Sequence, residues 1–421
     1  MKKIFKTADI LLPDFEKTDG TKWACIACDQ YTSEEEYWKK TEKIVGDAPS
    51  TLNLILPEVY LSETEERLPK ISSAMEKYLE TVLVSHPESM IYLERTQSDG
   101  KIRRGIIGMV DLEAYDYSKG ASSLIRATEG TVLERIPPRV HIRESASIEL
   151  PHIMLLIDDD KKTVIEKVAG MSGSLEDAYE FDLMQSAGHV KAKWLGKEEV
   201  GFVQSALEKL ILPDEIERKY GDRSVLPLLF AVGDGNHSLA SAKAHYENVK
   251  MKIGKEEALT HPSRYALAEV VNLHDDALGF EPIYRVAFGV CVNDLVGELK
   301  KYIKTLDGNA EPQKIQIITF GGNIEEIIVP SPEAQLTVGT LQAFLDEYKK
   351  SHPDAEVDYI HGESSVRSLV RDENTVGFLF DGMEKNQLFK TVIFDGALPR
   401  KTFSMGHADD KRFYIEGRKI R

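Results

Sequence analysis

Six consecutive residues, Gly233-Asp234-Gly235-Asn236-His237-Ser238, combine side chains that can move protons with glycines that permit a tight turn. An apolar run at 227–232 precedes them and an alanine-rich segment with helical spacing follows, so they are predicted to connect a buried strand to a helix. Glycine tolerates positive φ and lets the backbone approach a ligand closely, and a helix N-terminus attracts anions. The sequence therefore predicts a phosphate site at Gly233, Gly235, Asn236 and Ser238.

Asp234 and His237 are the candidate catalytic pair of this turn. The positive end of a helix dipole disfavours a protonated histidine in the first turn, which leaves a neutral imidazole beside a carboxylate. Such a pair can exchange protons with a phosphate ester or with a hydroxyl group. A strand, a glycine turn and a helix capped by Asp234 or Asn236 also form the ordinary α/β connection, so a purely structural role stays open.

Arginines are concentrated between residues 126 and 143 of this acidic chain, around the prolines 137 and 138. We expect Arg126, Arg139 and Arg143, together with Arg135, to gather around a phosphate, because guanidinium groups bind phosphate oxygens in pairs. Glu129, between Thr128 and Gly130, is the candidate general base. The alternative is a solvated surface on which these arginines pair with carboxylates.

The segment 398–421 is basic and carries glycine, serine and histidine among its cations. Its apolar side chains at 403, 405, 413 and 414 favour a folded segment over a disordered tail. We therefore expect it to return to the active site, with phosphate contacts from Arg400, Lys401, Lys411 and Arg412. Ser404, Gly406 and His407 lie in the same stretch.

The sequence leaves the roles of several other polar residues open. Asp29 either lines a cleft at the end of a strand or caps the next turn, and the acidic turn His274-Asp275-Asp276 either binds a divalent metal or is only a turn. We assign no metal ligands. His152 and His189 are interpreted as structural, and the Cys25–Cys28 pair as buried thiols rather than a redox or zinc motif.

The net charge, hydropathy and cysteine content of the chain disfavour several classes of function. The 421 residues carry 53 Lys and Arg against 70 Asp and Glu, a net charge of −17, which disfavours nucleic acid and anionic lipid as partners. No apolar stretch resembles a signal peptide or a membrane span, and three cysteines suit a reducing compartment, so a cytoplasmic location is expected. The sequence contains no Walker A, nucleophile-elbow, zinc-protease or dinucleotide-binding motif.

Strand and helix patterns alternate without a strict βαβ period, which predicts an α+β fold with mixed sheets and two or three domains. A doubly wound α/β sheet is the alternative. The expected divisions are an N-terminal domain at 1–145, a core domain at 146–290, a small inserted unit at 291–362 and a segment at 363–421 that returns to the core. We expect a hairpin over 89–116, helices over 175–184 and 197–211, and strands over 162–168 and 390–396.

Three stretches together resemble a known family: "VGDGNHSLASAK", "ACDQYTSEEEYW" and "RATEGTVLERIPPRVHIRESASIELPHI", with the distal "LPRKTFSMGHADDKRFYIEGRK". They are similar to an uncharacterised bacterial and archaeal family, the domain-of-unknown-function 1015 group, whose commoner hallmark is A-D-G-H-H-R. The resemblance spans most of the chain. It implies no particular chemistry, although the family's gene context suggests serine or phosphoserine as a first substrate to try.

A second resemblance is to the ParB, sulfiredoxin and free-serine-kinase superfamily, whose members hold nucleotide phosphates on a D-G-H-H-R turn before a helix. Asp234, Gly235 and His237 match that motif, whereas Asn236 replaces its first histidine and Ser238 its arginine. Lys243 or a basic side chain of the tail could supply the missing charge. This resemblance implies ATP or ADP with Mg²⁺ as ligands.

The sequence thus leads to one hypothesis and one rival. The first is an enzyme that acts on a phosphorylated small metabolite or nucleotide, as a small-molecule kinase or phosphatase. The rival is a non-catalytic protein that senses a nucleotide or phosphate. The oligomeric state stays open.

Overall fold

The computed structural model describes residues 3–406 and 408–421, and it confirms the expected α+β class with several sheets, of which the largest is mixed. The chain divides into two compact units. The larger comprises the described residues of Met1–Ala127, Thr131–Leu278 and His407–Arg421, and the smaller comprises Thr128–Gly130 and Gly279–Gly406. Within the described residues, no helix has both the length and the apolar character needed to cross a membrane.

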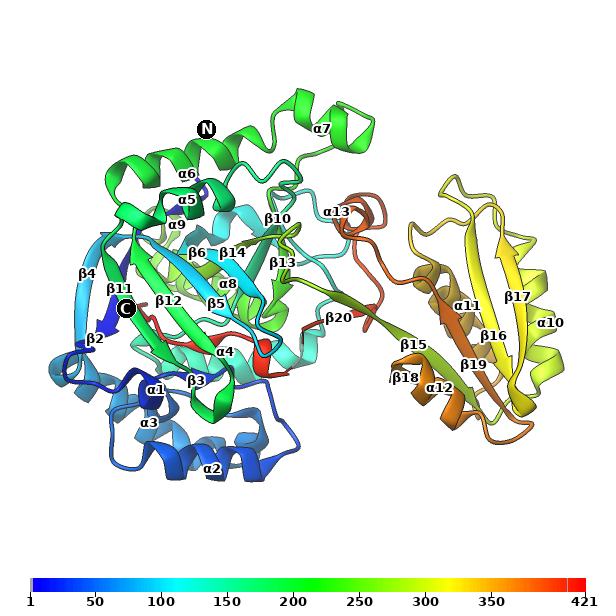
Figure 1. Ribbon diagram of the computed structural model, residues 1–421, viewed down its shortest axis with the longest axis horizontal. Helices are drawn as coiled ribbons and strands as arrows, with labels where there is room; N and C mark the ends of the chain where they lie inside the picture. Colours follow the sequence, from blue (N-terminus) through cyan, green and yellow to red (C-terminus); the bar gives the residue numbers. More distant parts are fainter. Residues whose placement is uncertain (1–2, 407) are drawn as a thin grey trace. The chain divides into compact units, whose positions relative to one another are not determined.

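The larger unit is built on a mixed sheet in the order β11-β12-β5-β6-β14-β10-β13-β8-β7, with β1 paired to β6 (Figure 1). These strands are β1 (Phe5–Lys6), β5 (Ile91–Thr96), β6 (Ile102–Asp111), β7 (Tyr115–Asp116), β8 (Ile125–Ala127), β10 (Met154–Ile157), β11 (Asp177–Asp182), β12 (His189–Trp194), β13 (Phe230–Asp234) and β14 (Tyr265–Asn272). Strands from residues 91–127 are interleaved in this sheet with strands from residues 154–272. That shared sheet is why residues on both sides of position 145 belong to one unit.

Both faces of this sheet are buried, because alternate side chains of each strand point to opposite sides. Ile91, Leu93 and Ile107 face a core formed with the N-terminal helices, and Tyr92 and Ile106 face a core formed with α5, α6 and α8. The helices of the unit are α1 (Gly20–Trp23), α2 (Glu35–Val45), α3 (Thr64–Thr81), α4 (Ile136–Ser145), α5 (Ile165–Met171), α6 (Lys197–Lys209), α7 (Pro213–Tyr220), α8 (Asn236–Ile253) and α9 (Lys255–Ala258).

The last residues of the chain return to the larger unit and pair with its N-terminal half. Short antiparallel pairings join β21 (Phe413–Tyr414) to β3 (Cys25–Ile26) and β22 (Arg418–Lys419) to β9 (Ile148–Glu149). A separate pairing within the N-terminal part joins β2 (Ala8–Pro13) to β4 (Leu83–Ser89). The indole N–H of Trp23 also donates to the carbonyl of Ile415 at 2.9 Å. The C-terminal segment is therefore part of the core rather than a loose tail.

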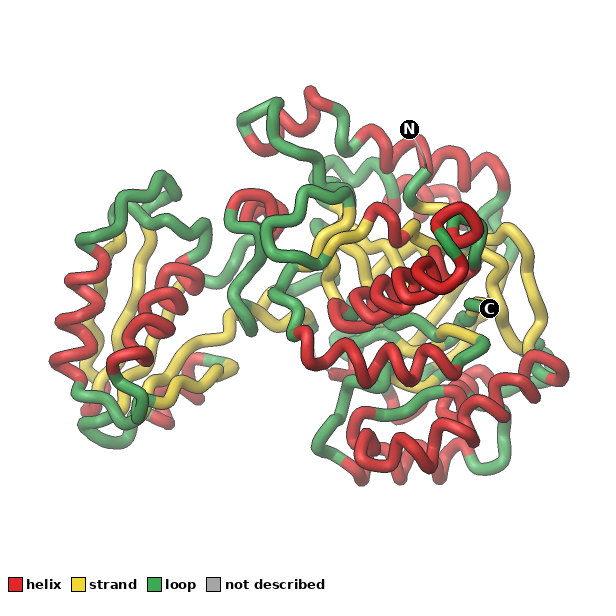
Figure 2. The backbone as a smooth tube through the Cα atoms, turned by 180° about the vertical axis from the view of Figure 1, so that it is seen from behind, coloured by secondary structure: helices red, strands yellow, loops and turns green. Residues whose placement is uncertain are grey.

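The smaller unit has its own sheet in the order β17-β16-β19-β15-β18, with β20 paired to β15. Its elements are β15 (Phe280–Phe288), α10 (Val292–Ile303), β16 (Gln313–Thr319), β17 (Asn323–Val329), α11 (Thr337–Ser351), β18 (Glu356–His361), α12 (Glu363–Leu369), β19 (Thr375–Phe380), α13 (Lys385–Phe394) and β20 (Phe403–Met405). Val286 packs with α12, whereas the neighbouring Arg285 donates to Gln342 of α11 at 2.8 Å, so helices cover both faces. Figure 2 shows helices of this unit in front of its strands.

The hairpin expected over 89–116 is confirmed by β5 and β6, which pair antiparallel with Gly100 at φ 82° in the turn. The helix expected over 175–184 is wrong, since this segment forms β11. Its larger apolar side chains at 179, 181 and 183 alternate with acids, which is the two-residue period of a strand.

The strands expected over 162–168 and 390–396 are also wrong, because they form parts of the helices α5 and α13. In α13 a capping box between Glu384 and Gln387 starts the helix. Burial of Leu388, Phe389 and Val392 on one face then outweighs the strand preference of Thr391, Val392 and Ile393.

Candidate functional site

The Gly-Asp-Gly-Asn-His turn lies where β13 ends and α8 begins, as the sequence predicts. Gly235 is the N-cap of α8 with φ 77°, a left-handed conformation that suits glycine, and a Cβ there would lie 3.1 Å from the Cα of Ile153. A Cβ on Gly233 would lie 2.7 Å from Leu156 Cγ. Close packing thus requires both glycines. Because Gly235 provides no side-chain cap, the first turn presents the positive end of an 18-residue helix.

Asp234 and Lys411 form the charged edge of this turn. Asp234 Oδ1 accepts the N–H of Gly235 at 2.9 Å, and its Oδ2 lies 3.2 Å from Lys411 Nζ. Both side chains are about one-fifth exposed. Lys411, one of the basic residues expected from the tail, therefore lies beside the turn.

His237 holds a neighbouring loop through one ring nitrogen. Its Nε2 accepts the backbone N–H of Val132 at 3.3 Å, so this nitrogen carries no proton in the arrangement seen. This contact gives His237 a structural task besides any catalytic one.

A second histidine, His152, lies at the same turn although the sequence suggests only a structural role for it. Its Nε2 lies 3.1 Å from Ser238 Oγ and 3.4 Å from Asp29 Oδ2, and its Nδ1 lies 2.7 Å from the hydroxyl of Tyr414. Tyr414 also contacts Cys28, with its hydroxyl 3.1 Å from Cys28 Sγ. His152 thus faces the carboxylate of Asp29 with one ring nitrogen and the hydroxyl of Tyr414 with the other.

The fold shifts the pKa values of His152 and Asp29 in opposite directions. Burial alone would lower the pKa of His152, but the charge and hydrogen bond of Asp29, with the charges of Asp234 and Glu58, raise it above its ordinary value. Burial would likewise raise the pKa of Asp29, yet His152, Gln30 and Lys411 lower it well below its ordinary range. Each partner thus favours the charged form of the other.

Ser238, His152 and Asp29 do not form a hydrolase triad. In such a triad the carboxylate and the serine contact opposite nitrogens of the imidazole, whereas here both lie on Nε2. Burial, followed by the charge of Asp29, raises the pKa of the neighbouring Cys28 to about 12, which keeps it a thiol. The cluster thus supplies charge and hydrogen bonds rather than an activated nucleophile.

A cavity of about 180 Å³ adjoins this cluster and is lined by Arg139 and Arg143 as well as by His152 and Ser238. Both arginines are paired with carboxylates, Arg139 with Glu58 and Arg143 with Glu149. The fold therefore brings these two arginines toward the turn, but with their charges compensated.

Two further predicted phosphate ligands are buried at structural positions. The guanidinium of Arg126 donates to the carbonyls of Ser123, Leu226 and Pro227. Arg412 forms buried ion pairs with Glu269 and Glu416. Arg135 lies in the short 3₁₀ helix Leu133–Arg135. Lys243 donates to the carbonyl of Leu112 at 3.0 Å.

The remaining tail residues and Glu129 belong to the smaller unit. Glu129 bridges to Leu398, Arg285 donates to the carbonyls of Arg400 and Lys401, and Lys401 Nζ lies 5.2 Å from the ring centre of Tyr359. Ser404 lies in β20 and Gly406 follows it with φ 69°. His407 lies outside the described residues.

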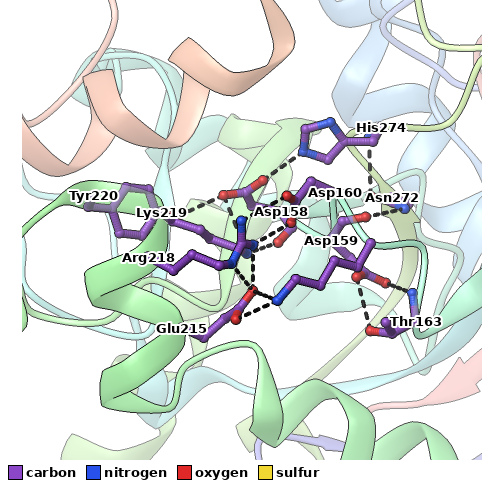
Figure 3. A network of polar contacts seen from close by, with 11 residues as sticks. Asp158, Asp159, Asp160, Thr163, Glu215, Arg218, Lys219, Tyr220, Asn272 and His274 are labelled. Carbon is purple, nitrogen blue, oxygen red and sulfur yellow. Dashed lines mark hydrogen bonds and ion pairs between the residues drawn. The ribbon is translucent and has the colours of Figure 1, made fainter.

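His274 of the acidic turn belongs to another network of the larger unit, at the ends of β10 and β14 (Figure 3). His274 Nε2 lies 2.7 Å from Asp158 Oδ1, and the hydroxyl of Tyr220 donates to Asp158 at 2.9 Å. Arg218 donates to Asp160 and Glu215. This network fixes α7 to the sheet. In the described part of the chain, no group of three or more His, Cys, Asp or Glu residues is placed to hold a metal ion.

Solved structures similar to the chain include a mutant free serine kinase in complex with AMP, at 11% identity and a TM-score of 0.37, covering 78% of this chain and 95% of that one. A conserved hypothetical protein from Pyrococcus furiosus matches at 11% identity and a TM-score of 0.33, covering 74% and 94%. C-terminally truncated SbnI from Staphylococcus aureus matches at 12% identity and a TM-score of 0.34, covering 73% and 85%. Likenesses of this size leave substrate and reaction open.

No curated protein matches the chain. A family model described as "Protein of unknown function (DUF1015)" matches residues 13–352, which is most of the sequence. The chain therefore belongs to the DUF1015 family.

Proposed function

We propose that this protein is a phosphotransferase that acts on a small molecule at the first turn of α8. The observation that carries the proposal is the convergence there of the helix N-terminus, the cation Lys411 and the paired side chains Asp29 and His152. These groups come from four distant parts of the sequence, and all lie in the larger unit.

The first step is binding of the phosphoryl group. Its negative oxygens would lie at the positive end of α8, close to Gly235, where a backbone without a side chain allows close approach. Lys411 would then exchange part of its contact with Asp234 for a phosphate oxygen. His152 adds a second cation near Ser238. Such placed charges stabilise the charge that develops on the transferred group.

The second step is transfer to a hydroxyl group. The acceptor oxygen attacks phosphorus, the bond from phosphorus to the leaving nucleotide oxygen breaks, and Asp29 accepts the hydroxyl proton. A carboxylate with a low pKa suits this role, because phosphoryl transfer mainly needs a group that orients the hydroxyl and takes its proton late. Water as acceptor would make the same site a phosphatase.

ATP or ADP with Mg²⁺ is the expected phosphoryl donor, as the resemblance through the Asp-Gly-Asn-His turn implies. Mg²⁺ usually enters such sites on the nucleotide phosphates with one or two carboxylates and neutralises phosphate charge. Asp29 and Asp234 are the carboxylates that border the turn. The gene context noted for the family makes serine and phosphoserine the first substrates to assay.

The test is turnover of ATP or ADP with serine, and of phosphoserine with water, by wild-type protein and by the Asp29→Asn variant. We expect Asp29→Asn to lower kcat at least about 100-fold while nucleotide affinity changes little, since it removes the proton acceptor and keeps the shape. Asp276→Asn is the matched control, because that carboxylate is exposed and pairs with Lys162 at the surface.

Three results are informative. Equal loss in the control would point to a general effect on the fold. Nucleotide binding without turnover by the wild-type protein would favour the sensor hypothesis. Full activity of Asp29→Asn would remove Asp29 from the mechanism.

A further inference from the structure

The cavity beside the turn has an aliphatic lining that the phosphoryl site does not use. It lies in the larger unit among α3, α4, the loops 54–56 and 148–153 and the first turn of α8, and its volume is about 180 Å³. Leu68, Ile71 and Met75 of α3 line it together with Leu54 and Ile148, and each of these side chains is at least nine-tenths buried. Its walls are thus mostly hydrocarbon.

The charged groups in the cavity wall compensate one another. Arg139 is paired with Glu58, and Arg143 with Glu149, whose pKa stays low because the charges of Arg418 and Arg143 outweigh its burial. A charged ligand group would gain little from ion pairs that are already formed and would lose its hydration. The cavity therefore suits an uncharged group.

The same cavity reaches the reacting groups. Ser238 and His152 line it, and His152 also contacts Asp29. A molecule whose apolar part filled the cavity would consequently place the adjoining atoms at the first turn of α8.

We propose that this cavity holds the hydrocarbon group of the phosphoryl acceptor, so that the substrate is an alcohol with an apolar body rather than free serine. This inference rests on the proposed function. A comparable cavity of about 150 Å³ lined by Leu, Ile and Phe stays dry and binds benzene, which sets the size of the group. A purine is a poorer occupant, because several of its ring nitrogens would face aliphatic side chains and lose water there.

The first experiment measures binding of a series of alcohols, from ethanol to 1-hexanol, and of benzyl alcohol, by thermal shift and calorimetry without nucleotide. The affinity for the alcohol should rise about fourfold for each methylene that enters the cavity. This ratio follows from the free energy of burying one methylene group. Serine should bind no better than ethanol. Affinity that stays flat along the series would overturn the proposal, and this arm needs no variant.

The second experiment fills the cavity. Ala146→Leu adds three carbons to a residue of the cavity wall, whereas Ala74→Leu adds the same atoms on α3 at a position that packs on the same core outside the cavity. We expect Ala146→Leu to abolish binding of benzyl alcohol and Ala74→Leu to retain it. Unchanged binding by Ala146→Leu would contradict the assignment, as would adenosine that binds and displaces benzyl alcohol.

The third experiment separates this inference from the proposed function. With ATP and Mg²⁺ present, benzyl alcohol should be phosphorylated with a higher kcat/KM than serine, and Asp29→Asn should stop the reaction while leaving benzyl alcohol binding intact. Alcohol binding without any phosphorylation would refute the phosphotransferase proposal and the acceptor role together, yet leave a hydrocarbon site. Phosphorylation of serine without alcohol binding would refute only the cavity assignment.

Discussion

At the scale of single residues, the ion pair between His152 and Asp29 should make stability depend on pH. The folded protein raises the pKa of His152, so its contribution to the free energy of unfolding is complete below the unfolded pKa of about 6.5 and is lost as pH rises through the folded pKa. The folded protein lowers the pKa of Asp29, so its contribution is complete above about 4 and is lost as pH falls through the folded pKa. The pair therefore stabilises most between these limits.

The His152→Gln variant tests this window. It removes the charge and keeps a side chain that can donate to Ser238, so the stability difference from wild type should be largest near pH 6 and should shrink at pH 8.5. Urea unfolding at pH 5, 6, 7 and 8.5 measures it. A difference that is constant across this range would mean that His152 is neutral in the folded protein.

At the scale of elements, the connection from β13 to α8 depends on the left-handed conformation of Gly235. Gly235→Ala should lower the free energy of unfolding by about 1–2 kcal/mol, because a Cβ is strained at φ 77° and would lie 3.1 Å from the Cα of Ile153. It should also weaken binding of phosphate or ATP, since the added Cβ stands where the backbone approaches the anion.

Urea unfolding and calorimetric titration measure the two effects. Gly170→Ala in α5 is the control, because a Cβ there meets nothing within 4 Å and alanine favours helix. Loss of stability with unchanged phosphate affinity would place the anion away from this turn.

At the scale of the whole molecule, the C-terminal segment completes the core of the larger unit. Arg412 forms ion pairs with Glu269 and Glu416, and Arg418 with Glu149, all with side chains almost fully buried. Removing a buried partner leaves an uncompensated charge, which typically costs about 3–5 kcal/mol. The two-strand pairings of β21 and β22 would be lost as well.

Truncation after residue 406 should therefore unfold the larger unit but spare the smaller one, whose sheet and helices lie within 279–406. Limited proteolysis should degrade the larger unit rapidly and leave a fragment near 279–406, and circular dichroism should show partial loss of structure. A truncated protein that unfolds in one full-amplitude transition at the wild-type temperature would contradict this dependence.

Local patterns in the sequence account for much of the fold. The hairpin at β5 and β6, the helix α6 and the turn before α8 all follow from periodicity and turn residues close together in the chain. Local pattern assigned the segments that become β11, α5 and α13 wrongly, because each is short and its state depends on the face that packs against the rest of its unit.

The candidate site likewise combines features that local sequence determines with features that depend on the fold. The sequence by itself determined Gly235 and the helix N-terminus, since a glycine turn between an apolar run and a helix is a local feature. Only the tertiary structure brought Asp29, His152 and Lys411 to that turn, compensated Arg139 and Arg143 with carboxylates, and placed Arg126 and Arg412 among structural contacts. The physical reason is that charge pairing and desolvation depend on which residues become neighbours in space, and residues 29, 152, 234 and 411 meet only through the pairing of strands far apart in the chain.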